Sequence, residues 1–192
     1  MYVVVLINTY GGEEKAVGHG AIAIQNRATG AWEYYSFYPV EGATWKMAFN
    51  LSFRAMLEHH SLDGNEFGKF IKREMYDDFL IFATNPSEEQ KMLDYINEIK
   101  AKVDNDVWWY RYRIYSNSCI DVVTDTLQEG IKIGDLPSHL VIDGALKPIN
   151  LIEAIITGIS PFRNVTGDLW RTDDVNDIKL DQPPPPEKKV FQ

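Results

Sequence analysis

The chain has little of what several common protein classes need. It contains one cysteine, so no disulfide can form within it and the fold must depend on its core. It has no apolar run long enough to cross a bilayer, so we expect no transmembrane segment. The apolar residues 1–7 have no basic leader and no small-residue cleavage site. We therefore expect a protein made in the cytoplasm without a signal peptide.

Positive charge is also scarce, with 19 basic against 28 acidic residues and a formal net charge of −9. Such a surface repels a phosphate backbone, so we expect no nucleic-acid partner. The short basic run Arg111-Tyr112-Arg113 is more typical of a solvated face than of a phosphate site. With 45% hydrophobic residues over 192 positions, the chain fits one globular domain.

The apolar patterns predict both strands and helices. Residues 2–7 read as a central strand, 18–24 and 32–38 as a β-hairpin, and 79–83 as a short strand. Helices are predicted from Pro86 through Ile99 and from Cys119 to Glu129, closed by Gly130. The aromatic residues 108–115 favour β structure, and 151–156 a short helix.

Residues 43–60 leave two interpretations open. Trp45, Phe49, Phe53 and Leu57 recur at helical spacing, but the stretch could equally be irregular. At the other end, four consecutive prolines follow Gln182, which favours an extended tail. We expect one domain over residues 1–170 and a proline-rich arm, extended or disordered, over 171–192.

Cys119 is the candidate nucleophile. Residues 115–118 supply helix-capping side chains, which places the cysteine at a helix N-terminus, where backbone N–H groups and the helix dipole lower a thiol pKa. The same N–H groups can bind an oxyanion. The alternative is that this lone cysteine is a small buried hydrophobic residue.

His19 is the candidate base. His59, His60 and His139 lie in charge-rich or proline-containing stretches, where solvent exposure explains them. His19 instead opens an apolar strand between Gly18 and Gly20, small neighbours that suit the close approach of another element. The alternative is a structural histidine with satisfied hydrogen bonds.

Strand register suggests a third residue. A turn centred near Arg27-Ala28 sets His19 opposite Ser36 and Ala21 opposite Tyr34. Ala21 and Ala23 share the face of His19, and a helix could dock on these small side chains. Ser36 is then the candidate that orients the imidazole, and Glu33 or Tyr35 replaces it if the register slips by one residue.

Two polar residues beside the cysteine have simpler explanations. Asn117 is most simply the N-cap of the helix, and Asp121 complements the helix dipole in the first turn. A carboxylate so close to Cys119 would oppose thiolate formation unless it points away.

The segments 18–24, 32–37 and 117–123, with histidine preceding cysteine, resemble the circularly permuted NlpC-type branch of the papain-like fold. Its relatives include lecithin retinol acyltransferase and the domains at the ends of Rhs and other toxin proteins. Residues 76–90 are similar to the strand and helix that precede the cysteine in those toxin-associated domains. The resemblance covers roughly residues 1–160. It implies an α+β fold with a small antiparallel sheet packed against helices, with Cys119 as nucleophile and His19 as base.

The resulting expectation is a cysteine hydrolase that cleaves an amide through an acyl-enzyme. The resemblance implies a peptide or peptidoglycan substrate, an antibacterial effector role, export by a specialised secretion system and an inhibitory immunity protein as partner. We expect no cofactor and no metal. Two alternatives remain, namely a lipid-acting acyltransferase or lipase on the same fold and a non-catalytic binding domain whose prolines dock a partner.

Overall fold

The computed structural model describes residues 1–8, 18–40, 52–113, 116–131, 141–142, 145–146, 153, 155 and 169–172. These residues form an α+β fold. The strands are β1 (Tyr2–Asn8), β2 (His19–Gln25), β3 (Trp32–Pro39), β4 (Ala55–Leu62), β5 (Asp78–Ala83), β6 (Val141–Ile142), β7 (Ala145–Leu146) and β8 (Leu169–Thr172). The helices are α1 (Gly64–Arg73), α2 (Pro86–Asp104) and α3 (Cys119–Gly130), with a short 3-10 helix, η2 (Trp108–Tyr110), after α2.

The main sheet has six antiparallel strands in the order β4-β3-β2-β1-β5-β8, and β6 pairs with β7 in a separate hairpin. Strand β1 lies inside the sheet between β2 and β5, and residues 3–7 are buried on both faces. The prediction of a central strand with both faces covered is therefore confirmed. The predicted antiparallel sheet packed against helices is also present.

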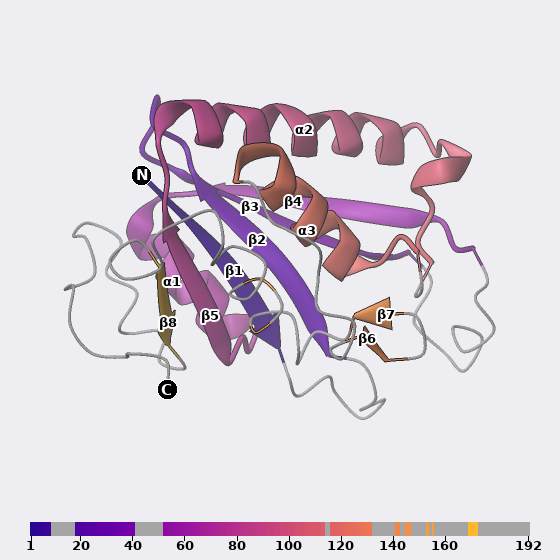
Figure 1. Ribbon diagram of the computed structural model, residues 1–192, viewed down its shortest axis with the longest axis horizontal. Helices are drawn as coiled ribbons and strands as arrows, with labels where there is room; N and C mark the ends of the chain where they lie inside the picture. Colours follow the sequence, from indigo (N-terminus) through magenta and orange to yellow (C-terminus); the bar gives the residue numbers. More distant parts are fainter. Residues whose placement is uncertain are drawn as a thin grey trace.

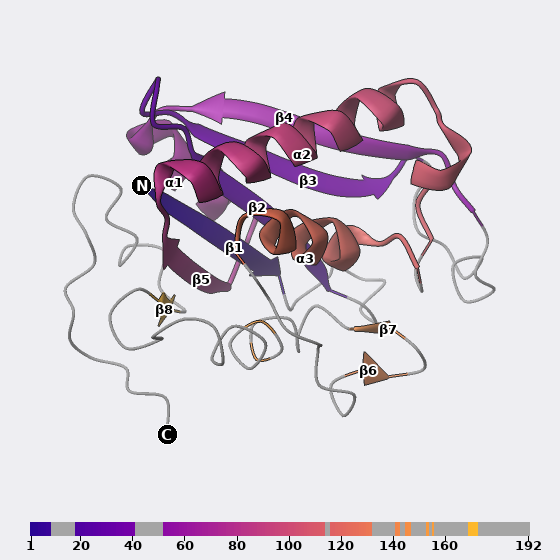
Figure 2. The ribbon, with the colours of Figure 1, turned by 45° about the horizontal axis from the view of Figure 1, so that its top comes forward.

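Two apolar cores cover the two faces of this sheet. On one face, which we call the α2/α3 face, Val3, Val5, Ile22 and Ile24 pack in one core with the buried side of α2 and α3. On the other, the α1 face, Val4, Leu6, Ala21 and Ala23 join a second core with Phe67, Phe70 and Ile71 of α1. Figures 1 and 2 show α2 and α3 side by side over the first face and α1 behind the sheet.

The longest helix, α2, begins where the sequence predicts. The Asn85 side chain accepts hydrogen bonds from the N–H groups of Ser87 and Glu88, and Glu88 accepts one from the N–H of Asn85. Pro86 stands in the first turn, where its missing N–H costs no hydrogen bond. The predicted start of this helix is confirmed, and the helix continues past the predicted Ile99 to Asp104.

Residues 55–60, for which helical spacing was one interpretation, lie in strand β4. Ala55 and Leu57 are buried while Met56 between them is 41% exposed, which is the period-two pattern of a strand. Pairing with β3 along the whole of β4 outweighs the weak helical periodicity. Trp45 and Phe49 lie outside the described residues.

Two further segments differ from expectation. Trp108–Tyr110 is a 3-10 turn instead of a strand, and the described part of 108–115 keeps β structure only in two isolated bridges, Phe53 with Tyr112 and Arg113 with Asn117. Helix α1 is not predicted from the sequence. The signal for it was present, because Asp63 and Glu66 form a reciprocal capping box at its start.

The sheet extends past the expected domain boundary. Strand β8 pairs with β5 through Thr172, and Arg171 makes an ion pair with Asp78. Residues 171 and 172 therefore belong to the domain and not to the arm, and residues 173–192 lie outside the described residues. Of the predicted helix at 151–156, Glu153 and Ile155 are helical and the rest lies outside the described part. In the part of the chain that the structure describes, no helix is long and apolar enough to span a membrane.

Candidate functional site

Cys119 is the first residue of α3, as the sequence predicts. Ser118 is the N-cap, and its N–H and hydroxyl both donate to the same carboxylate oxygen of Asp121, each at 2.7 Å. The predicted structural role of Asp121 is confirmed. Asn117 is not the N-cap, because its amide nitrogen donates to the carbonyl of Arg111 at 2.8 Å.

The thiol of Cys119 lies in the interior. The residue is 4% exposed and belongs to the core of the α2/α3 face. Burial raises the pKa of the Cys119 thiol, and the Asp121 carboxylate raises it further. The expectation that the helix N-terminus lowers this pKa is wrong, because removal of the thiolate from water outweighs the helix end.

Hydrogen-bond donors nevertheless converge on the sulfur. The backbone N–H groups of Gly20 and Ile120 and the hydroxyl of Tyr112 act against the rise in the Cys119 pKa. Gly20 has no side chain on the α2/α3 face, which leaves room for the sulfur beside the strand. The sequence predicts that another element approaches the backbone closely at the glycines beside His19. At Gly20 this element is α3, through Cys119.

The imidazole of His19 lies on the opposite face of the sheet. Successive side chains of a strand alternate between faces, so His19 shares the α1 face with Ala21 and Ala23. The helix that covers those alanines is α1, whereas α3 packs on the α2/α3 face with Ile22 and Ile24. The prediction that the Cys119 helix docks against the His19 face is wrong, and the structure does not bring the Cys119 and His19 side chains together.

Ser36 is the residue that His19 contacts. The imidazole Nε2 lies 2.7 Å from the Ser36 hydroxyl oxygen, so the predicted pairing of these two side chains is confirmed. The register behind it differs by two residues, since Ala21 and not His19 lies opposite Ser36. The reason is the turn, where Gly30 adopts φ +75° and donates its N–H to the carbonyl of Asn26. An even shift keeps every side chain on its predicted face.

The alternatives to Ser36 lie on the other face. Glu33 accepts hydrogen bonds from Ser61 and bonds to His59, and Tyr35 stacks on the His59 ring at 4.6 Å. His59 and His60 lie in β4 and have carboxylate partners, so the stretch is not weakly structured as predicted. The predicted solvent exposure is confirmed for His59, and His60 is partly exposed. His139 lies outside the described residues.

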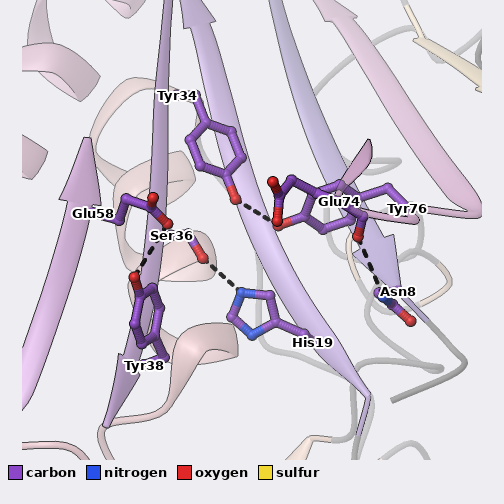
Figure 3. A pocket seen from close by; sticks show the side chains of 8 residues that line it. All are labelled: Asn8, His19, Tyr34, Ser36, Tyr38, Glu58, Glu74 and Tyr76. Atoms are coloured by element: carbon purple, nitrogen blue, oxygen red, sulfur yellow. Dashed lines mark hydrogen bonds between the residues drawn. The ribbon is translucent and has the colours of Figure 1, made fainter. Parts of the chain in front are cut away.

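His19 and Ser36 line a pocket of about 320 Å³ on the α1 face. Figure 3 shows the lining side chains pointing toward a common space from four strands and from the turn that follows α1. The lining residues are Asn8, His19, Tyr34, Ser36, Tyr38, Glu58, Glu74 and Tyr76. Most of them are absent from the sequence predictions, although the alternation Tyr34, Ser36, Tyr38 along one strand face is a signal that could have indicated them.

Hydrogen bonds order these side chains. The hydroxyls of Tyr34 and Tyr76 are 2.7 Å apart, and the hydroxyl of Tyr38 donates to Glu58 at 3.2 Å. The other oxygen of Glu58 bonds to Nε2 of His60 at 2.7 Å. The side chains of the pocket wall are therefore held in small hydrogen-bonded groups and are not independent of one another.

The protonation states follow from burial. Burial lowers the pKa of His19 to about 4, with Glu58 opposing the shift, so the imidazole is neutral at pH 7. Burial also raises the pKa of Tyr34 and of Tyr38 to about 12, the latter with a further contribution from Glu58. The tyrosine hydroxyls keep their protons at physiological pH and can donate hydrogen bonds.

The arginines flanking Tyr112 have partners on the protein. Arg111 makes two hydrogen bonds to Asp106, and the guanidinium groups of Arg111 and Arg113 lie over the Trp108 ring at 5.0 and 5.4 Å. This agrees with the interpretation of the run as a surface feature.

Comparison with known proteins adds nothing to this picture. No family model, no curated protein and no solved structure matches the chain.

Proposed function

We propose that this chain is a cysteine-nucleophile hydrolase of a permuted papain-like, NlpC-type fold, which cleaves an amide bond with Cys119. The observation that supports it is the position of Cys119 as the first residue of α3, where hydrogen bonding from Gly20, Ile120 and Tyr112 acts against the rise in its pKa. A cysteine that serves only as a small hydrophobic residue requires no such donors. A thiolate, or the oxyanion formed on attack, is stabilised by them.

The proposal requires that His19 change face, because its imidazole is bonded to Ser36 on the α1 face. His19 is the first residue of β2 and lies between Gly18, with φ +65°, and Gly20. Glycine has access to backbone conformations that other residues lack. The proposed movement is a rotation at Gly18 and Gly20 that carries the imidazole to the Cys119 side and gives up the pairing of His19 with Asn8. The resting state is then one with a neutral thiol and a neutral imidazole.

In the chemical step, the Cys119 thiol gives its proton to His19, and the thiolate attacks the carbonyl carbon of the amide. The C–N bond breaks, and His19 returns the proton to the leaving amine. Water then hydrolyses the thioester, which restores the thiol. By the resemblance stated above, the substrate is a peptidoglycan peptide and the protein an antibacterial effector.

The test uses the fact that Cys119 is the only cysteine, so alkylation reports on this residue alone. We expect iodoacetamide to label the folded protein at neutral pH faster than the small exposure of Cys119 alone would allow, and His19→Ala to slow that labelling. His59→Ala is the matched control, because His59 lies on β4 and bonds to Glu33. Slow labelling that is the same in wild type and His19→Ala would refute the cysteine mechanism.

Substrate choice needs a second assay. Purified peptidoglycan and phospholipid vesicles are incubated with wild type and Cys119→Ser, and released amines or fatty acids are measured. Amine release from peptidoglycan that is lost in Cys119→Ser supports the proposal. Fatty-acid release would instead identify the lipid-acting alternative.

A non-catalytic binding domain is the second candidate function. The observations that favour it are the 4% exposure of Cys119 and the ordered pocket on the α1 face. It predicts that neither substrate is cleaved and that Cys119 labels only when the chain is unfolded.

A further inference from the structure

The pocket around His19 and Ser36 has a chemical character of its own, independent of Cys119. It lies on the α1 face, while the Cys119 sulfur belongs to the α2/α3 face. The lining draws on β1, β2, β3, β4 and the turn after α1. Because several strands hold it, the pocket is a preformed part of the fold rather than a feature of one loop.

The lining is rich in hydrogen-bond acceptors and in negative formal charge. Glu58 and Glu74 supply carboxylates, and the described residues that line the space include no lysine or arginine. Each carboxylate has a partner in the described part of the chain: Arg73, whose side chain is 70% exposed, bonds to Glu74 at 3.0 Å, and the His60 imidazole bonds to Glu58. Among the described lining residues, an anionic ligand would meet two carboxylates and no basic side chain.

Aromatic rings complete the wall. The Tyr76 ring lies 6.5 Å from the His19 ring and 6.4 Å from the Tyr34 ring, and Tyr38 closes the space next to Glu58. Tyrosine rings attract cations through their negative π faces, and carboxylates attract them through their full negative charge. The tyrosine rings and the carboxylates therefore both favour a positively charged ligand.

The size sets an upper bound on the ligand. A volume of about 320 Å³ is at the lower end of small-molecule sites, which span roughly 300–1,000 Å³. A compound of amino-acid or diamine size fits this volume.

We infer that this pocket binds a small organic cation with a primary ammonium group, held between the carboxylates of Glu58 and Glu74 and the tyrosine rings. The ammonium donates to carboxylate and hydroxyl oxygens, and its alkyl chain lies against the aromatic wall. Asn8 and Ser36 supply further polar groups at the rim and floor. No bond is formed or broken.

The experiment compares three probes of equal chain length and different charge by isothermal titration calorimetry. Cadaverine carries two ammonium groups, pentane-diol is neutral, and glutarate carries two carboxylates. We expect saturable one-to-one binding of cadaverine to the full chain and no binding of the diol or of glutarate. Absence of saturable cadaverine binding, or equal binding of glutarate or the diol, would overturn the inference.

Variants locate the site. Glu58→Gln keeps the shape and the acceptor for Tyr38 but removes the charge, and we expect it to weaken cadaverine binding by at least about tenfold. Glu74→Gln serves the same purpose if Glu58→Gln does not fold. Glu98→Gln, on the exposed side of α2, is the matched control and should bind as wild type does. Unchanged affinity in a folded Glu58→Gln or Glu74→Gln would also overturn the inference.

Cys119→Ser separates this inference from the proposed hydrolase. The substitution abolishes hydrolysis under the proposed function, while cadaverine binding should be unaffected because the sulfur lies on the opposite face.

Discussion

The Nε2 atom of His19 lies 2.7 Å from the hydroxyl oxygen of Ser36, on the face of the sheet opposite to Cys119. This hydrogen bond holds the imidazole in the pocket and away from the sulfur. If His19 serves Cys119, the bond to Ser36 is what opposes its movement.

Removal of the Ser36 hydroxyl should therefore favour the position of the His19 imidazole on the Cys119 side of the sheet. A hydrogen bond contributes about 1 kcal/mol, so Ser36→Ala is expected to speed iodoacetamide labelling of Cys119 by about fivefold. Ser61→Ala is the control, because Ser61 donates to Glu33 and does not contact His19. Equal labelling rates in wild type and Ser36→Ala would show that His19 does not move toward Cys119.

Tyr112 should affect the ionisation of Cys119. Its hydroxyl stabilises the thiolate and so acts against the effect of burial on the Cys119 pKa. Tyr112→Phe is expected to raise that pKa further and to slow alkylation at neutral pH. A titration that follows the ultraviolet absorbance of the thiolate against pH measures the pKa of Cys119 in both proteins. A pKa in Tyr112→Phe equal to or below that of wild type would contradict the assigned hydrogen bond.

The elements that the sequence predicts well are those whose signals are local. The apolar run at 2–7 and the Asn85-Pro86 start of α2 each identify their element without reference to the rest of the chain. The Ser118 cap does the same for α3. Strand β4 has no such signal, because Glu58, His59 and His60 are polar and become strand residues only by pairing with β3.

The error at the site has a different cause. Alternation along β2 shows that His19 shares a face with Ala21 and Ala23, but not which helix covers that face. Small side chains favour helix docking, and a helix does dock there. It is α1, while the larger residues Ile22 and Ile24 face the α2/α3 layer. The choice between the two layers depends on the whole topology and not on the pattern of one strand.

Gly130 should be intolerant of a side chain. A Cβ there would lie 2.5 Å from Met92 Cγ and 2.6 Å from the backbone oxygen of Glu88, so α2 and α3 would have to separate. We expect Gly130→Ala to lower the free energy of unfolding by about 1–3 kcal/mol. Gly68→Ala is the matched control, because nothing lies within 4 Å of its Cβ position in α1. In Gly68→Ala, the alanine reduces the conformational entropy of the unfolded chain, which should stabilise the protein by about 0.5–1 kcal/mol. Urea denaturation measures both, and similar effects at the two positions would contradict the packing of α2 on α3.

Asp125 should weaken the fold at neutral pH. Burial raises its pKa to about 6, and the carboxylates of Asp121 and Glu129, one helical turn away on either side, add to the rise. The charged form is thus less favourable in the folded state, so Asp125→Asn should raise the free energy of unfolding at pH 8. The residue is still exposed to solvent in part, and water screens its charge, so we expect a gain below about 1 kcal/mol. The gain should vanish near pH 4, where the wild-type residue is protonated in the folded protein. A gain that persists at pH 4 would point to packing instead of charge.

His19 should make stability depend on pH in the opposite direction. Its pKa is about 4 in the folded protein and near 6.5 in the unfolded chain, because burial disfavours the imidazolium. Between these values the unfolded chain binds the proton and the folded protein does not, so the free energy of unfolding falls as pH drops from 6.5 to 4. For a pKa shift of this size, the free energy of unfolding falls by roughly 3 kcal/mol in total.

In His19→Gln, which cannot titrate but can still bond to Ser36, this part of the acid sensitivity should disappear. The difference in unfolding free energy between wild type and His19→Gln, measured by urea denaturation at several pH values, isolates the histidine from Asp125 and the other acids. A difference that is constant from pH 7 to pH 4 would mean that the imidazole is accessible to water and not held in the pocket as the structure describes.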